Sequence, residues 1–148
     1  MRKLLLVLAL APLPAVIAPA VAQASVTSLA DMRCMIDNLY HEARGEGVKG
    51  LQAVASVVMN RADRQQLNIC KVVYSRKQFS WTIAKRVKAV EGDIGDILNV
   101  AQAATSHTLV DATGGATHYH TKQVKPYWAK TLKKTETIGQ HIFYKKHD

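Results

Sequence analysis

Residues 38–47 read NLYHEARGEG, and this stretch joins two predicted helices. Before it, apolar residues recur at helical spacing over residues 29–43, after a capping box in which Ser28 is the N-cap and Asp31 follows three residues later. The glycines of the stretch end this first helix. A second helix is predicted over residues 48–64. Its buried side is expected to consist of Leu51, Val54, Ala55, Val58 and Ala62.

The hydrophobic pattern changes from helical to strand-like along the chain. A short β-branched run at residues 71–74 and a polar-aromatic loop at 77–81 precede a third predicted helix over 83–90. After a turn at 92–95, Asp96 is expected to cap a fourth helix that extends to Leu109. Its inward residues are predicted to be Ile97, Val100, Ala101 and Ala104.

Strands are predicted only in the C-terminal part. A turn cluster at 111–115 is followed by alternation with period two over residues 116–121, and a second strand is predicted over 138–144, interrupted by Gly139. Pro126 and Trp128 lie in the loop between them. Helices first and short strands late indicate the α+β class, and no linker divides the chain.

The N-terminus has the pattern of a secretory signal peptide. Arg2 and Lys3 precede an apolar run over 4–16, and residues 22–24 read AQA, with the small residues of a cleavage site. The run is shorter than the roughly 20 apolar residues of a membrane span, although an uncleaved anchor is the alternative. We therefore expect residues 1–24 to be removed. Residues 25–148 would then form one domain, exported to the periplasm, cell envelope or exterior, without stable membrane insertion.

The charge of the chain limits its partners. It has 20 Lys and Arg against 11 Asp and Glu, a net charge of +9. A basic exported domain can attract an acidic envelope polymer, whereas export argues against nucleic acid as a partner. A modest lysine cluster is either a solvated basic face or a surface that attracts such a polymer. It consists of Lys130, Lys133, Lys134, Lys145 and Lys146.

The two cysteines, Cys34 and Cys70, suggest one disulfide in an oxidising compartment. It would close a loop of about 36 residues and contribute roughly 3 kcal/mol. Two buried free thiols are the alternative, because spacing does not establish bridge geometry.

Metal and nucleotide chemistry find no support in the sequence. No Cys/His spacing resembles a zinc site, and Gly45 stands where a His-Glu-x-x-His motif starting at His41 would need its second histidine. The glycine spacing of residues 45–50 lies between helices rather than after a strand, which argues against dinucleotide binding. We expect no metal and no cofactor.

Carboxylate chemistry remains, and Glu42 is the best-placed acid. It lies near the buried stripe of the first predicted helix, at the negative end of the helix dipole, where the neutral form of a carboxyl group is favoured. On these residues alone, a solvated glutamate paired with Arg44, Lys49 or Arg61 is the alternative.

An ordered series of short motifs resembles the SleB-type cell-wall hydrolases. It comprises residues 34–47, GLQAVA at 50–55, VMNR at 58–61, CKVVY at 70–74, QFSW at 78–81, GATHYH at 115–120, PYW at 126–128 and IGQHIFY at 138–144. The resemblance implies a lysozyme-like α+β fold, mainly helical with a small antiparallel sheet. Lys77 departs from the family, because many exported relatives carry a cysteine there, and this leaves the cysteine pairing open.

The resemblance also implies an activity on peptidoglycan glycan strands. It implies cleavage of the β-1,4 bond between N-acetylmuramic acid (MurNAc) and N-acetylglucosamine (GlcNAc), and the family's catalytic glutamate falls on Glu42. Acting as acid and then base, Glu42 would make the chain a lytic transglycosylase that forms 1,6-anhydro-MurNAc ends. Two alternatives stay open: a hydrolytic muramidase that uses Glu42 and Glu46 as a pair, and a non-catalytic envelope-binding domain.

Several further residues are candidates for substrate binding in a monomeric enzyme. Glu46 is one, although shaping or capping the second helix is a simpler role for it. The loop and strand candidates can hold a sugar, or can instead be structural. His118 and His120 share one strand face opposite Tyr119. These loop and strand candidates are Gln78, Ser80, Trp81, His118, Tyr119 and His120.

Overall fold

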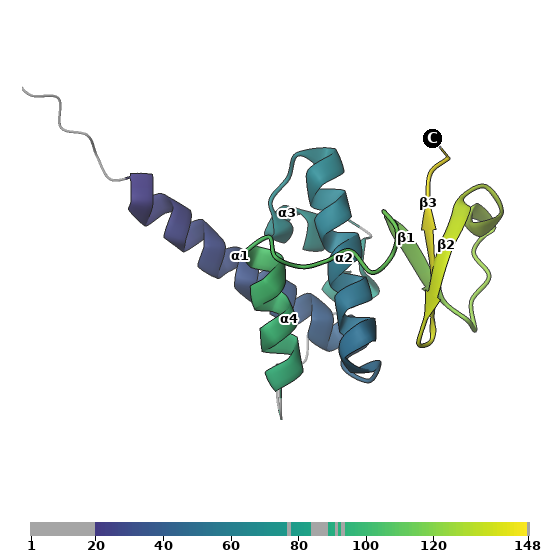
Figure 1. The fold of residues 1–148 in the computed structure, drawn as a ribbon, viewed down its shortest axis with the longest axis horizontal. Coiled ribbons are helices and arrows are strands. Elements are labelled where there is room, and N and C mark those ends of the chain that lie inside the picture. Colours follow the sequence, from purple (N-terminus) through teal and green to yellow (C-terminus); the bar gives the residue numbers. More distant parts are fainter. Residues whose placement is uncertain (1–19, 77, 84–88, 91, 93, 148) are drawn as a thin grey trace, which may run out of the picture.

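A computed structural model describes residues 20–76, 78–83, 89–90, 92 and 94–147. Helices form most of it, and a small sheet lies at one end (Figure 1). Its elements are α1 (Ala20–Ala43), α2 (Gly47–Gln65), α3 (Ile69–Val73), η1 (Ser80–Ile83), α4 (Gly95–Thr105), β1 (His118–Thr121), η2 (Tyr127–Lys130), β2 (Lys133–Ile138) and β3 (His141–Lys145). The strands form an antiparallel sheet of order β1-β3-β2. The predicted α+β class, mainly helical with a small antiparallel sheet, is confirmed.

The helices enclose the main hydrophobic core. Met35 and Leu39 of α1 meet Val54 and Val58 of α2 and Val100 of α4, and all five are buried. The inward faces predicted for α2 and α4 are confirmed, because every residue assigned to them is buried. Burial of these side chains removes apolar surface from water, which is the main stabilising term for such a domain.

The sheet packs on a second side of α2. Ala53 and Val57 of α2 contact Ala116 and Phe143 in a smaller buried cluster. Figure 1 accordingly shows α2 between the other helices and the sheet. With α2 in this central position, the end of α1 and strand β1 border one groove.

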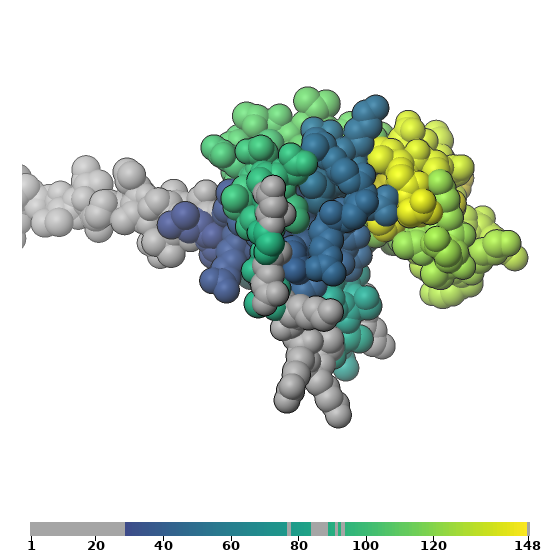
Figure 2. All heavy atoms as spheres, turned by 90° about the horizontal axis from the view of Figure 1, so that it is seen from below, coloured from purple at the N-terminus to yellow at the C-terminus, as the bar shows by residue number. Residues whose placement is uncertain are grey.

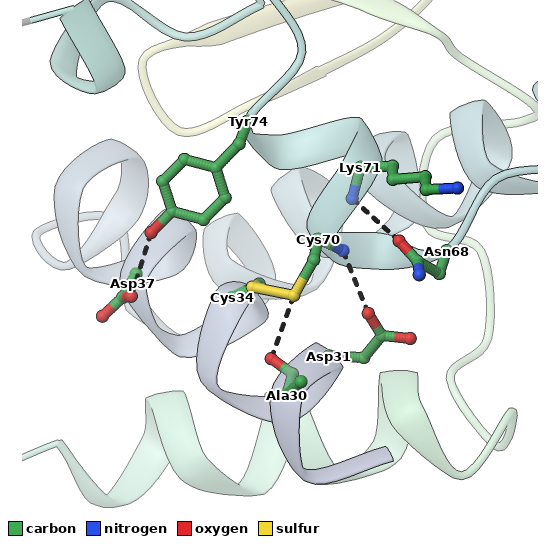
Figure 3. The surroundings of a disulfide bond; sticks show 8 residues. All are labelled: Ala30, Asp31, Cys34, Asp37, Asn68, Cys70, Lys71 and Tyr74. Atoms are coloured by element: carbon green, nitrogen blue, oxygen red, sulfur yellow. Dashed lines mark hydrogen bonds between the residues drawn. A yellow bond between two sulfur atoms is a disulfide. The ribbon is translucent and has the colours of Figure 1, made fainter. Parts of the chain in front are cut away.

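The predicted N-terminal capping box is wrong. Helix α1 begins at Ala20, so Ser28 lies inside it rather than at its N-cap. The Asp31 carboxylate instead accepts a hydrogen bond of 3.0 Å from the backbone N–H of Cys70, in the first turn of α3 (Figure 3). Asn68 caps the same helix by accepting from the N–H of Lys71. Asp31 therefore stabilises a helix N-terminus, but that of α3.

Other helix boundaries also differ from the predictions. Ile94 is the N-cap of α4, while Asp96 lies in its first turn. The helix ends at Thr105 rather than Leu109, because the chain adopts a left-handed conformation at His107 (φ 56°). The β-branched run at 71–74 falls largely in α3. Most of the helix predicted over 83–90 lies outside the described residues.

The C-terminal region contains a hairpin where one interrupted strand was predicted. Strands β2 and β3 are separate, and Gly139 makes the turn between them with a φ of +56°. A left-handed residue at this place favours glycine. Strand β2 was missed because its residues, KKTETI, are mostly polar and exposed. The predicted loop around Pro126 and Trp128 contains the short helix η2.

A disulfide joins α1 to α3 through Cys34 and Cys70, as Figure 3 shows. Closing this 36-residue separation in the unfolded chain contributes roughly 3–4 kcal/mol. The expected signal-peptide boundary after residue 24 falls within α1, and residues 1–19 lie outside the described part. None of the helices described here is both long and apolar enough to cross a membrane.

Candidate active site

A groove of about 260 Å³ lies where the end of α1, the loop before η1 and the sheet meet. It brings together five of the eight residues predicted to form the site: Glu42, Gln78, Ser80, Tyr119 and His120. Arg61, Phe79, Thr121, Val124 and His141 complete its lining. Residues from five separate parts of the chain therefore converge on one concave surface.

Glu42 is held by the phenol of Tyr119. The Tyr119 hydroxyl donates a hydrogen bond of 2.8 Å to Oε2 of Glu42. Burial raises the pKa of Tyr119 well above its ordinary value, and the charge of Glu42 and the hydrogen bond to it raise it further, while Arg61 lowers it. The phenol therefore stays protonated near neutral pH and fixes one oxygen of the carboxyl group.

Arg61 places a buried positive charge beside this pair. Its Nε donates a hydrogen bond of 2.7 Å to the carbonyl oxygen of Thr117, just before β1. Burial lowers the pKa of Arg61, while Tyr119 and Glu42 raise it. A guanidinium remains charged in proteins under such shifts. Arg61 thus ties α2 to β1 and contributes positive charge to the groove.

Glu46 does not line the groove, and its carboxylate contacts the β2–β3 hairpin. Its Oε2 accepts a hydrogen bond of 2.7 Å from the backbone N–H of Gln140 and lies 4.0 Å from Nδ1 of His141. Glu46 occupies the N-cap position of α2, but its side chain makes no capping hydrogen bond. The predicted position of Glu46 at the start of the second helix is thus confirmed, but its carboxylate does not cap that helix and instead holds the turn of the hairpin.

Two other predicted site residues lie outside the groove lining. The Trp81 ring stacks on His41, with 4.6 Å between centroids, next to Tyr74. The His118 ring lies 5.4 Å from that of Trp128, on the sheet face opposite Tyr119. Both rings have structural neighbours.

His141 was not predicted to belong to the site. In the β1–β3 register it is opposite Thr121, and its ring makes an edge contact with Tyr119 at 5.1 Å. Burial lowers the pKa of His141, the charges of Glu46 and Glu42 raise it, and His120 lowers it. The signal that could have found it is strand pairing, because residues opposite each other in an antiparallel pair share a face.

Two larger hollows occur elsewhere on the described structure. One of about 410 Å³ includes Arg44 and Asp96, and another of about 570 Å³ lies along α3. We assign the site to the smaller groove because it combines a carboxylate with a phenol, two histidines and a guanidinium. No group of three or more His, Cys, Asp or Glu side chains in the described ranges is placed to hold a metal ion.

The family of the chain follows from its sequence between the first two helices and the last strand. The sequence pattern of a family described as cell wall hydrolase matches residues 45–144, which is more than half of the chain. The chain belongs to the cell wall hydrolase family. It is therefore an enzyme that acts on the cell wall. The matched region begins at Gly45, just after Glu42.

Two solved structures resemble this cell wall hydrolase. One is the catalytic domain of the germination-specific lytic transglycosylase SleB from Bacillus anthracis, 25% identical, with a TM-score of 0.66 over 78% of this chain and 93% of that one. The other is the catalytic domain of the Bacillus cereus SleB protein, 25% identical, with a TM-score of 0.67 over 79% and 91%. No curated protein sequence matches the chain. The resemblance to the SleB-type family is confirmed.

Proposed function

We propose that this cell wall hydrolase is a lytic transglycosylase that cleaves the MurNAc–GlcNAc β-1,4 bond of peptidoglycan, with Glu42 as its single acid and base. One observation carries the proposal: among the described residues that line the groove, Glu42 is the only one with a carboxyl group. A second carboxylate is needed to activate water or to attack the sugar, but not when the nucleophile belongs to the substrate. The similarity to the Bacillus anthracis lytic transglycosylase supports the same reaction type.

The reaction can be written with Glu42 alone. The neutral carboxyl group of Glu42 gives its proton to the glycosidic oxygen as the bond to the muramic C1 breaks, and C1 gains oxocarbenium character. The resulting carboxylate then takes the proton of the C6 hydroxyl on the same sugar, and O6 bonds to C1. This closes a 1,6-anhydro ring, returns the proton to Glu42 and consumes no water.

The contacts of Glu42 suit this double role. Tyr119 holds Oε2, which leaves Oε1 for the glycosidic oxygen. Tyr119 and Arg61 stabilise the carboxylate that forms when the proton leaves, because both offer positive potential from a buried position. Gln78, Ser80 and His120 line the same groove and supply hydrogen-bonding groups for sugar hydroxyl and N-acetyl groups.

Hydrolysis by a Glu42–Glu46 pair is disfavoured by the position of Glu46. Two-carboxylate glycosidases hold both groups toward the scissile bond, about 5–5.5 Å apart for retention and about 6.5–9.5 Å for inversion. The Glu46 carboxylate is engaged by the N–H of Gln140 and faces His141. These contacts support a structural role for Glu46 rather than the predicted role in substrate binding.

We also propose that the enzyme is exported after removal of residues 1–24 and acts as a monomer. The substrate of a cell wall hydrolase lies outside the cytoplasm, and the N-terminal sequence has the pattern of a signal peptide. The Cys34–Cys70 disulfide is consistent with an oxidising compartment.

The proposal is tested by Glu42→Gln, with Glu46→Gln as the matched control. We expect Glu42→Gln to clear a peptidoglycan suspension at least about 1,000-fold more slowly than wild type, because it loses proton transfer in both steps. Glu46→Gln should keep most of the activity. Circular dichroism and thermal unfolding establish that both variants are folded. A folded Glu42→Gln protein that clears the suspension at the wild-type rate would refute the catalytic role of Glu42.

A further inference from the structure

The two faces of the sheet have different neighbours. Tyr119 and Phe143 are paired across β1 and β3 and face α2, whereas His118 and Tyr144 are paired on the opposite, outer face. The Trp128 ring, from η2, lies 5.4 Å from His118 and 5.6 Å from Tyr144. These ring contacts hold the segment 121–132 against the outer face of the sheet.

This segment and the strands beside it carry much of the positive charge of the chain. Residues 116–147 contain seven lysines and a single acidic residue, Glu136. Lys122, Lys125, Lys130 and Lys134 are exposed, and none of them forms an ion pair with a described carboxylate. Lysines held at such density without counter-charges create a positive potential that attracts an anionic ligand. Lys134 lies on β2, and the other three lie in the segment 121–132 that packs on the sheet. We call these four lysines the sheet lysines.

The sheet lysines begin where the groove ends. Val124 lines the groove and is 53% exposed, and Lys122 and Lys125 lie on either side of it in the sequence. Tyr127, which follows, is 87% exposed. Figure 2 shows this yellow-green part of the chain projecting beyond the rest of the molecule. A strand bound in the groove and extending past Val124 would therefore meet the sheet lysines.

We propose that the sheet lysines bind the carboxylates of the peptide stems on peptidoglycan strands, outside the groove that cleaves the glycan. This inference rests on the proposed function, because it takes the substrate to be peptidoglycan. Stem peptides carry free carboxylates at intervals along the glycan, so several weak contacts would add along one strand. Each contact is exposed, so binding should weaken as ionic strength rises. The surface would retain the enzyme on its polymer and guide the glycan toward Glu42.

The test measures binding to insoluble peptidoglycan freed of other polymers, with Glu42→Gln in every protein so that the strands stay intact. We expect Lys122→Gln/Lys125→Gln to weaken binding about five- to tenfold at low salt and to show a shallower salt dependence. The matched control is Lys49→Gln/Lys71→Gln, which removes the same charge from exposed positions on α2 and α3. Equal losses in the two double variants would overturn the proposal, because net charge alone would then explain binding.

A second arm identifies the ligand group. Amidation of the stem carboxylates should weaken binding of the parent protein and abolish its advantage over Lys122→Gln/Lys125→Gln. An advantage that persists on amidated peptidoglycan would overturn the assignment to carboxylates. Binding is read in proteins without Glu42, so its outcome is independent of cleavage. Failure of the catalytic proposal appears instead as clearing activity in Glu42→Gln.

Discussion

The inner and outer faces of the sheet use similar residues for different purposes. On the inner face, the Tyr119 hydroxyl donates to Glu42. On the outer face, the Tyr144 hydroxyl lies 3.1 Å from Nε2 of His120 and takes part in an aromatic cluster. Two neighbouring residues of one four-residue strand therefore differ in role: Tyr119 holds the Glu42 carboxyl group, whereas His120 lines the groove and also contacts Tyr144 of the outer cluster. The two tyrosines are chemically alike, and the face on which each one lies decides its role.

Removing the hydroxyl of Tyr119 or of Tyr144 should give the largest difference in activity between the two faces. Tyr119→Phe keeps the ring in place but loses the hydrogen bond to Glu42, and we expect kcat to fall about 10- to 100-fold, because a hydrogen bond to a charged group contributes about 1.5–3 kcal/mol. Tyr144→Phe, the control on the outer face, should keep kcat within about twofold. Initial rates of peptidoglycan clearing measure both. Equal losses in kcat would show that the faces are not distinct.

The hairpin that supports the inner face should be sensitive at Gly139. Its φ is +56°, and a Cβ atom there would collide with the Glu46 carboxylate. We expect Gly139→Ala to reduce the free energy of unfolding by about 1–3 kcal/mol. Gly45→Ala is the control, because a Cβ at Gly45 meets nothing within 4 Å, and it should change stability by less than about 0.5 kcal/mol. Urea titrations compare them, and a Gly139→Ala protein as stable as wild type would contradict the contact with Glu46.

A smaller effect is expected from the histidines on the two faces. Burial lowers the pKa of His141 on the inner face, although Glu46 and Glu42 oppose this, and burial together with Arg61, Lys146 and Arg64 lowers that of His118 on the outer face. Because both folded pKa values lie below the unfolded value of about 6.5, the unfolded chain takes up protons first as the pH falls. Their contribution to stability is therefore complete above about pH 6.5 and is lost as the pH falls through the folded pKa values.

The measurement for these histidines is the free energy of unfolding at pH 8, 6.5 and 5. Stability should decline between pH 6.5 and 5, and His118→Gln should make this decline shallower. An unchanged slope in His118→Gln, with stability rising toward pH 5 in wild type, would show that the histidines gain rather than lose protons on folding.

The helical part of the fold could be predicted because its signals are local. The spacing of Leu51, Val54 and Val58 determines which face of α2 is buried, and the same holds for Ile97 and Val100 in α4. The capping box at Ser28 failed because a local motif does not reveal a longer helix. Asp31 instead accepts a hydrogen bond from the first turn of α3, from a residue 39 positions away in the sequence.

The site could be predicted only in part, because its geometry depends on contacts between distant segments. Glu42 stood out from its place in the first helix, but its partner Tyr119 is 77 residues away. His141 and Glu46 meet through the turn at Gly139, which the strand pattern treated as an interruption. Trp81 and His118 were attractive by residue type, yet they pack on other aromatic rings. Spacing correctly predicts that His118 and Tyr119 lie on opposite faces of the strand, but it contains neither the strand register nor which face packs on α2.

The most direct test of the central claim, that Glu42 acts alone as acid and base, is the mass of the sugar ends that the wild-type enzyme produces. Purified peptidoglycan is digested to completion, and the released muropeptides are analysed by mass spectrometry. The account predicts 1,6-anhydro-MurNAc ends, lighter by one water than reducing ends, because the C6 hydroxyl of the substrate is the nucleophile. Products with only reducing MurNAc ends would contradict it, because they require an attacking water.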